Sequence, residues 1–366
     1  MRFQLPVFFV YNALLCRLCV STVCMAVSAT LSADVLDPDT RLPKGEVIDI
    51  FYQMQPLMSE QQTHILEQGS LEALNAIAQD LFLPPSTPAE KSHENQETAT
   101  INSFYKSHTA LVDDTTTSLF ESLGFFKNIT PSVKKYDLYL LPGGSLDQVR
   151  DRLNELAELI NNKQVICSEQ SKIFIILHET AAPLPGSTSL PVHSSSCARE
   201  PSLSDFNRVD ASHIAPLKYV VAESLLPQSI KDNIRFISSS ASSAPSIKGE
   251  SALCEQHPPL ASSRDVISTP DVKYLVDILL REGFFQNVSS VSPKKALLLS
   301  AQPYVDYHEI ALKVDLAKCR RVDLLLQIDA VGRVSHSRES FKEQFGLYLS
   351  VLSKSLRSEL DFLHNQ

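Results

Sequence analysis

The pattern of apolar and polar positions is clearest in residues 136–160. Leu138 to Leu141 form an apolar run, Pro142 to Ser145 form a glycine-containing turn, and apolar residues then recur every three or four positions. This pattern predicts a strand, a tight turn and a helix, which is the opening unit of an open α/β sheet. Such a turn directs backbone N–H groups at the helix N-terminus, where anions bind well.

The same pattern continues along the chain and predicts an alternation of strands and helices. Further strands are expected at Lys172–Leu177, Ile234–Ile237, Ala296–Ser300 and Asp323–Ile328, with Leu217–Val221 as either a strand or part of a turn. Helices are expected at Glu46–Met54, Gln61–Phe82, 101–123, Asp147–Ile160, Thr269–Arg281, Val305–Leu316 and Phe341–Leu363. We therefore expect the α/β class, as a three-layer Rossmann-like domain with a mostly parallel sheet plus an N-terminal helical extension.

The first 29 residues have the composition of a targeting segment. Arg2 and Arg17 are their only charges, an apolar run covers Leu18–Val27, and Val27-Ser28-Ala29 fits a cleavage site. These features predict a secretory signal, with an uncleaved membrane anchor as the alternative. We divide the chain into the signal or anchor at 1–29, a helical region and linker at 30–119, and a Rossmann-like domain at 120–366.

Composition narrows the classes of partner. The net charge is −9 and no basic cluster stands out in the sequence, which argues against nucleic-acid binding. Of the seven cysteines, Cys167, Cys197, Cys254 and Cys319 follow the leader. Their spacing matches no zinc motif. They permit two disulfides, and isolated buried thiols are the simpler expectation.

Ligands of open α/β sheets bind beyond the carboxyl ends of the strands, and this rule selects the candidate residues. The anion-binding candidates are Gly143, Gly144, Ser145, Arg152, His178, Glu179, Ser300 and Gln302. Each has a structural alternative: a turn that needs glycine, a solvated helix arginine, or a polar strand end. His308 is expected on a helix surface, and Asp329 as a polar cap after the fifth strand.

Several familiar motifs are missing from the sequence. It contains no G-x-x-x-x-G-K-[ST] loop, no G-x-G-x-x-G, no G-x-S-x-G and no H-E-x-x-H. A nucleoside triphosphatase, a standard dinucleotide site, a serine hydrolase of the α/β type and a zincin-like metal site are therefore unsupported. Two glycosylation triplets, Asn128-Ile129-Thr130 and Asn287-Val288-Ser289, are of a kind that also arises by chance.

Three segments carry a family resemblance: YDLYLLPGGSLDQVRDRL, STPDVKYLVDIL and LLLSAQPYVDYHEIAL. Together, over roughly residues 120–365, they resemble the YdcF-, SanA- and ElyC-like bacterial envelope proteins, built on domain of unknown function 218. By that likeness Gly143, Gly144, Arg152 and Ser300 match family motif positions, as do Thr269 and Asp271. The chain departs from the family at Leu177-His178-Glu179-Thr180, where a glycine is lost, and at Tyr304-Val305-Asp306-Tyr307, which replaces His-x-x-Arg. The resemblance implies an envelope role and binding of S-adenosylmethionine or another nucleotide.

The leading hypothesis is an exported, envelope-associated Rossmann-like protein, periplasmic or anchored in the inner membrane. It would bind a nucleotide-like or other anionic small molecule at the strand ends. A second hypothesis is a noncatalytic envelope scaffold that keeps only the fold. A third is an enzyme acting on an envelope anion through His178 or Glu179. The sequence identifies no cofactor and no oligomeric state.

Overall fold

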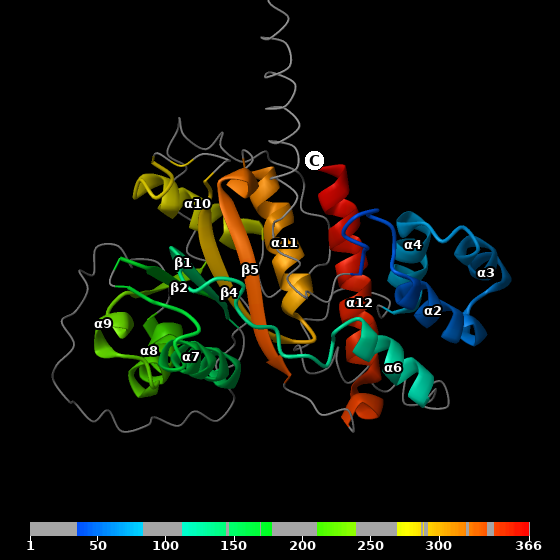
Figure 1. The fold of residues 1–366 in the computed structure, drawn as a ribbon, viewed down its shortest axis with the longest axis horizontal. Helices are drawn as coiled ribbons and strands as arrows, with labels where there is room; N and C mark the ends of the chain where they lie inside the picture. The colour runs from blue at the N-terminus through cyan, green and yellow to red at the C-terminus, as the bar shows by residue number, and fades with distance from the viewer. Residues whose placement is uncertain are drawn as a thin grey trace, which may run out of the picture.

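The computed structural model describes residues 35–82, 112–143, 146–168, 170–177, 211–238, 269–286, 288, 292–319, 322–334 and 340–365. Within these ranges five strands form one sheet in the order β3-β2-β1-β4-β5 (Figure 1). Their bounds are β1 Leu138–Pro142, β2 Lys172–Leu177, β3 Ile234–Ser238, β4 Lys294–Gln302 and β5 Leu326–Val334. All four neighbouring pairs are parallel, which confirms the predicted α/β class with a Rossmann-like sheet.

Helices cover both faces of the sheet. The helices α7 (Leu146–Asn161) and α8 (Ala211–Glu223) pack on one face, against Tyr139, Leu297 and the other side chains on that side. The opposite face packs against α10 (Thr269–Arg281) and α11 (Val305–Lys318) through residues such as Leu138 and Leu298. Alternate residues of β1 and β4 thus enter different cores, as expected for strands buried on both sides.

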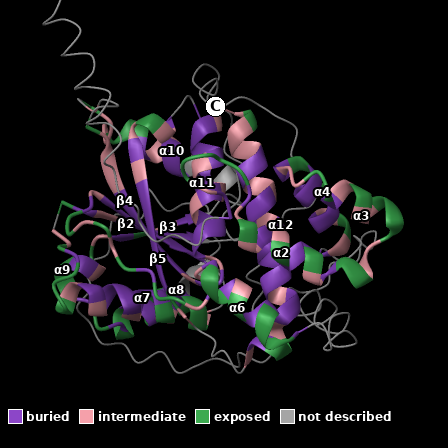
Figure 2. Ribbon diagram, turned by 45° about the vertical axis from the view of Figure 1, so that its right-hand side comes forward, coloured by how far each residue is buried: buried purple, intermediate pink, exposed green. Residues whose placement is uncertain are grey.

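A second helical layer lies outside α11. The long helix α12 (Phe341–His364) packs along α11, and the N-terminal helices lie on the far side of α12 (Figure 1). These are α2 (Gly45–Gln53), α3 (Glu60–Leu66), α4 (Leu71–Leu81) and α6 (Asp114–Ser122), with a single 3-10 turn at Gln55–Leu57. Phe120, Phe341 and Tyr348 form an aromatic cluster at their centre. Burial continues from the sheet into this layer (Figure 2).

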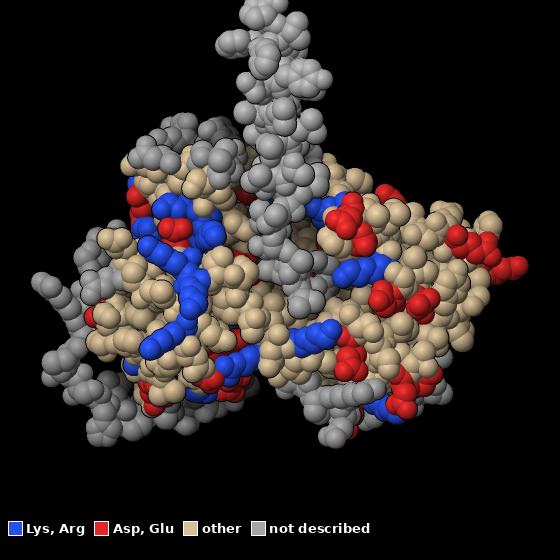
Figure 3. All heavy atoms as spheres, viewed as in Figure 1, with Lys and Arg blue, Asp and Glu red and all other residues tan. Residues whose placement is uncertain are grey.

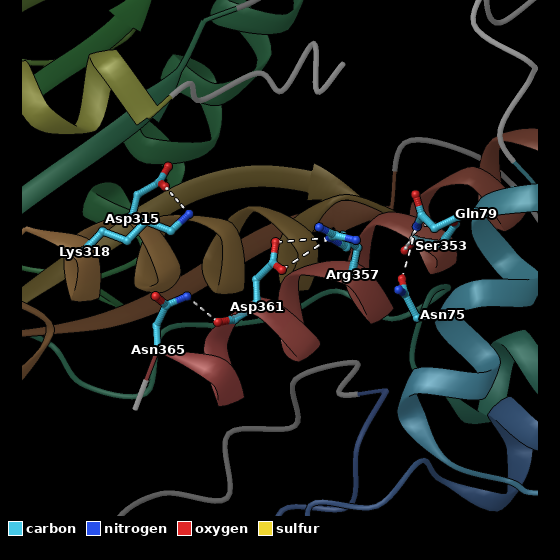
Figure 4. A network of polar contacts seen from close by, with 8 residues as sticks. All are labelled: Asn75, Gln79, Asp315, Lys318, Ser353, Arg357, Asp361 and Asn365. Carbon is cyan, nitrogen blue, oxygen red and sulfur yellow. Dashed lines mark hydrogen bonds and ion pairs between the residues drawn. The ribbon is translucent and has the colours of Figure 1, made fainter. Parts of the chain in front are cut away.

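Polar contacts lie along α12 and between α12 and α4 (Figure 4). The side-chain amide of Gln79 on α4 donates to both the hydroxyl and the carbonyl of Ser353, at 2.9 and 3.2 Å. Ser353 is fully buried, and its small side chain lets α4 approach α12 closely. Further along α12, Arg357 pairs with Asp361 one turn later, at 3.3 Å. The N-terminal helices are therefore fastened to the last helix of the chain.

Several predicted boundaries are wrong, and each has a local cause. The predicted helix Gln61–Phe82 is two helices, α3 and α4. Gly69 adopts φ +60° between them, and the Ser70 side chain caps α4 by accepting a hydrogen bond from Ala73 N. Leu217–Val221 is neither a strand nor a turn but lies inside α8, which buries Leu217, Val220 and Val221 at helical spacing. Between α8 and β3, Gln228–Lys231 forms one helical turn, α9.

The fifth strand lies further along the chain than predicted. Val322–Leu324 forms a 3-10 turn, η6, and β5 continues to Val334, so Asp329 is inside the strand and not a cap after it. Asp329 Oδ2 accepts hydrogen bonds from Ser132 N and Ser132 Oγ, at 2.8 and 2.7 Å, and from the Tyr136 hydroxyl. Ile129 also pairs with Gly332 in an antiparallel bridge. The segment before β1 therefore covers the outer edge of β5.

Cysteine chemistry differs from the expectation of isolated thiols. Cys319, at the end of α11, is disulfide-bonded, and its partner lies outside the described residues. Cys167 is a free thiol, and burial raises its pKa. The predicted leader, 1–29, also lies outside the described residues. Within the described part of the chain, no helix combines the length and apolarity needed to span a bilayer.

Candidate functional site

The strand order reverses direction between β1 and β4. The chain runs outward from β1 to β2 and β3 on one side, and through β4 to β5 on the other. The crossover helices α7 and α11 therefore leave the carboxyl ends of β1 and β4 toward opposite faces of the sheet. Ligands of doubly wound sheets bind at such a reversal, beyond the strand ends. The predicted residues Gly143, Arg152 and Ser300 all belong to these two strand–helix units.

Arg152 reaches back over the glycine turn, as the sequence allowed. It lies on the second turn of α7 but is only 5% exposed. Its Nη1 donates to the carbonyl oxygens of Pro142 and Gly143, both at 2.5 Å, just past the end of β1. Its Nε is buried without a hydrogen-bond partner, and within the described ranges no carboxylate forms an ion pair with it. The expectation of a solvated helix arginine is wrong here.

The guanidinium stays charged although it is buried. Burial lowers the pKa of Arg152 to about 10, while the nearby Glu155, Asp151 and Tyr304 oppose the shift. A pKa of about 10 leaves the side chain protonated at neutral pH. The site therefore holds one positive charge that is screened little by water.

Ser300 and His308 form the second part of the site. Ser300 lies near the carboxyl end of β4, two residues before Gln302, and His308 lies one turn into α11. Ser300 Oγ lies 2.6 Å from His308 Nδ1, and the two residues are 1% and 2% exposed. The ring of Tyr304 stacks on the imidazole, with centroids 5.5 Å apart and an interplanar angle of 12°. The prediction that His308 lies on a helix surface is wrong, because α12 covers α11.

The hydrogen bond fixes which ring nitrogen carries the proton. Burial, and then the charges of Arg152 and Lys354, hold the pKa of His308 well below its ordinary value, so the ring is neutral. If Nδ1 carried the proton, the buried Ser300 hydroxyl would have no acceptor and Nε2 no donor. If instead Ser300 donates to Nδ1, the Nε2–H of His308 is the one group left without a hydrogen-bond partner. This arrangement leaves one buried polar group unsatisfied instead of two, so it costs less free energy.

Two buried N–H donors without partners therefore lie at the same strand ends, one charged and one neutral. The charge on Arg152 is close enough to depress the pKa of His308. The N-terminus of α7, a helix of 16 residues, begins at the same edge of the sheet. Its dipole adds positive potential there. This combination of donors suits an oxyanion such as a phosphate or a carboxylate.

Glu155 lies one turn from Arg152 and adds a titrating group. It is 7% exposed, and burial raises its pKa to about 7 despite Arg333 and Arg152. Arg333 Nε lies 3.9 Å from its carboxylate, and the guanidinium also pairs with Glu158. Near neutral pH, Glu155 therefore changes the net charge beside Arg152.

The remaining predicted residues divide into two groups. Gln302 has a structural role, because its Nε2 donates to the carbonyls of Gly124 and Lys127 at 3.3 and 3.2 Å and holds the turn before β1. Gly144, Ser145, His178 and Glu179 lie outside the described residues, next to the ends of β1 and β2. Within the described ranges no group of His, Cys, Asp and Glu is arranged to hold a metal ion.

Sequence reasoning missed His308 and Glu155. The strand-end rule reaches His308, one turn after the fourth strand, but the sequence pattern assigned it to a helix surface and so left it out of the site. Glu155 carried no signal, since an acidic residue three positions from an arginine on an amphipathic helix is ordinarily solvated. Comparison with protein-family models, with curated proteins and with solved structures finds no match to this chain. The functional argument therefore rests on the residues.

Proposed function

We propose that this chain is an exported Rossmann-like protein that binds an anionic small molecule at the switch point between β1 and β4. Arg152 supplies the charge, the Nε2–H of His308 supplies a neutral donor, and the N-terminus of α7 orients the anion. The observation that carries the proposal is the buried Arg152, whose hydrogen bonds go to two carbonyl oxygens and whose Nε has no partner. A buried cation that forms no ion pair with a carboxylate of the described residues is costly unless an anion completes it.

Two independent features support export. The first 29 residues have the composition of a secretory signal. Cys319 is disulfide-bonded, and disulfides persist mainly in oxidising compartments. Placement in a bacterial envelope rests on the family resemblance and stays a hypothesis, as do nucleotide binding and the scaffold alternative.

A calorimetric titration of the full chain tests the binding site. The probes are inorganic phosphate, pyrophosphate, adenosine monophosphate and S-adenosylmethionine. We expect at least one of them to bind the wild-type chain. Arg152→Met should weaken that binding by about 10- to 100-fold, the loss of one charge-assisted hydrogen bond to a buried anion. Arg152→Lys, which keeps the charge, should lose less.

Arg150→Met is the matched control. Arg150 lies on the same helix but is exposed and pairs with Asp147 at 2.5 Å. It should bind the probe within about twofold of wild type, a difference of less than about 0.5 kcal/mol. Circular dichroism of each variant separates lost binding from lost folding. Equal affinities of Arg152→Met and Arg150→Met would place the anion elsewhere, and no binding of any probe would favour the scaffold hypothesis.

A further inference from the structure

The amino-terminal edge of the sheet, opposite the candidate site, carries a row of cations. We call it the basic edge and define it by Lys134, Lys135, Lys172, Arg235, Lys294 and Lys295. Two Lys-Lys pairs that are 160 residues apart in the sequence precede β1 and begin β4. Figure 3 shows a band of Lys and Arg side chains over the part of the molecule where β1, β2 and β4 lie in Figure 1.

The strand register brings these residues together. Leu138 of β1 pairs with Lys172 on one side and with Ala296, the residue after Lys295, on the other. Phe174 of β2 pairs with Arg235 of β3. Since neighbouring strands are about 4.8 Å apart, the backbone positions of these cations lie along one edge of the sheet across four strands. The sequence alone does not reveal this row, because it depends on β1 and β4 being neighbours.

Acidic neighbours neutralise only part of the basic edge. Glu282 pairs with both Lys172 and Arg235, and Asp137 pairs with Lys294 at 3.2 Å. Among the described residues, no carboxylate forms an ion pair with the side chains of Lys134, Lys135 or Lys295. The edge therefore remains positive on a chain whose net charge is −9.

An exposed apolar side chain lies within the same edge. Ile166 forms a bridge with Lys135, and it is 55% exposed. Tyr136 and Tyr139 are 1% and 0% exposed and offer no face for stacking on a base, and the ring of the half-buried Phe284 is already covered by Lys294 Nζ, 5.5 Å from its centroid. Cations around an exposed aliphatic side chain suit the headgroup region of a bilayer, whereas single-stranded nucleic-acid sites combine cations with exposed aromatic rings.

We propose that the basic edge docks the protein on a bilayer surface that contains anionic lipids. Lys134, Lys135 and Lys295 contact the lipid phosphates, and Ile166 enters the headgroup layer. The carboxyl edge with Arg152 and His308 then faces away from the bilayer. This proposal uses residues separate from those of the anion site, so either can fail without the other.

Vesicle cosedimentation of the full chain tests the docking surface. The vesicles consist of phosphatidylcholine alone or of phosphatidylcholine with phosphatidylglycerol, at low and at high salt. The test variant replaces Lys134, Lys135 and Lys295 by Gln, which breaks no ion pair among the residues that the structure describes. The control replaces the exposed Lys127, Lys218 and Lys342 by Gln and changes the net charge equally. All chains carry the same N-terminus, so any contribution of the first 29 residues cancels.

We expect wild type and the control to bind the anionic vesicles, with affinity falling at high salt. The test variant should bind about 100-fold more weakly, from roughly a fivefold loss for each of the three lysines. Equal binding of the test and control variants would overturn the proposal, as would equal binding to both vesicle types. A loss of duplex-DNA binding in the test variant, with vesicle binding unchanged, would assign the edge to nucleic acid and also overturn it.

Discussion

The hydroxyl of Ser300 donates to Nδ1 of His308 across 2.6 Å, and the two residues come from consecutive elements, β4 and α11. This contact joins the end of a central strand to the helix that follows it. Burial and the charges of Arg152 and Lys354 keep the imidazole neutral, and donation from Ser300 places the ring proton on Nε2. The candidate site thus depends on a residue that need not touch the ligand.

Replacing Ser300 by Ala tests this role. The change leaves the buried Nδ1 without its donor, so the free energy of unfolding in urea should fall by about 1–3 kcal/mol. Nitrogen NMR should show the Nε2–H tautomer in wild type and a mixture in the variant. Ser118→Ala, on the exposed side of α6, should change stability by no more than about 0.5 kcal/mol. An Nδ1–H tautomer in the wild-type protein would contradict the assignment.

Gly332 of β5 makes room for the same site. It pairs with Ser300 in the sheet, and a Cβ at this position would lie 2.5 Å from Val305 Cγ2 and 3.1 Å from the Ser300 carbonyl oxygen. Gly332→Ala should therefore lower the free energy of unfolding by about 1–3 kcal/mol through overpacking. Adding Val305→Ala should recover part of the loss, so the pair is less destabilised than the sum of the single variants.

Gly45→Ala is the matched control for this substitution. Gly45 begins α2, and a Cβ there would meet nothing within 4 Å. Its stability should be unchanged or slightly higher, because alanine favours a helix over glycine. If both alanine variants unfold at the same urea concentration, the close contact that a Cβ at position 332 would make with Val305 does not destabilise the fold.

The disulfide at Cys319 gives a prediction about stability and redox state. Peptide mapping without reduction should recover the Cys319 peptide linked to a second cysteine peptide, while Cys167 reacts as a free thiol after unfolding. Reduction should cost about 2–4 kcal/mol of stability, since the cross-link restricts the unfolded chain. Recovery of Cys319 as a free thiol from an oxidising medium would contradict this assignment and remove one support for export.

The sequence predicted the strands and the glycine turn, and it allowed Arg152 to reach back over that turn, because these features depend on residues close together in the chain. The run at Leu138 to Leu141 is too apolar for a surface strand, and an arginine two turns into the next helix can reach back to the turn. These inferences need only the period of the hydrophobic pattern and the direction of helical side chains.

His308 could not be placed in the same way. The helix α11 is buried almost all round, because the sheet lies on one side of it and α12 on the other. A helix between two layers has no solvent-facing stripe, so the usual assignment of its polar residues to the surface fails. The predicted fifth strand ended too early for a related reason. A carboxylate at Asp329 indicates the end of a strand in the sequence, but Ser132 and Tyr136, which are distant in the chain, donate hydrogen bonds to it inside β5.

Glu155 should make stability depend on pH near neutrality. Burial raises its pKa to about 7 in the folded chain, above its ordinary value of 4.5. The folded state therefore holds a proton that the unfolded state has released, and stability falls as pH rises from about 4.5 to about 7. The shift corresponds to roughly 3 kcal/mol at most.

Glu155→Gln cannot titrate, so its urea midpoint should lose this part of the pH dependence, and it should be more stable than wild type at pH values of about 8. Glu158→Gln is the control, because Glu158 is exposed and its pairing with Arg333 lowers its pKa. If wild type and Glu155→Gln keep parallel stability curves from acid to alkaline pH, Glu155 is ionised throughout and its charge does not vary beside Arg152.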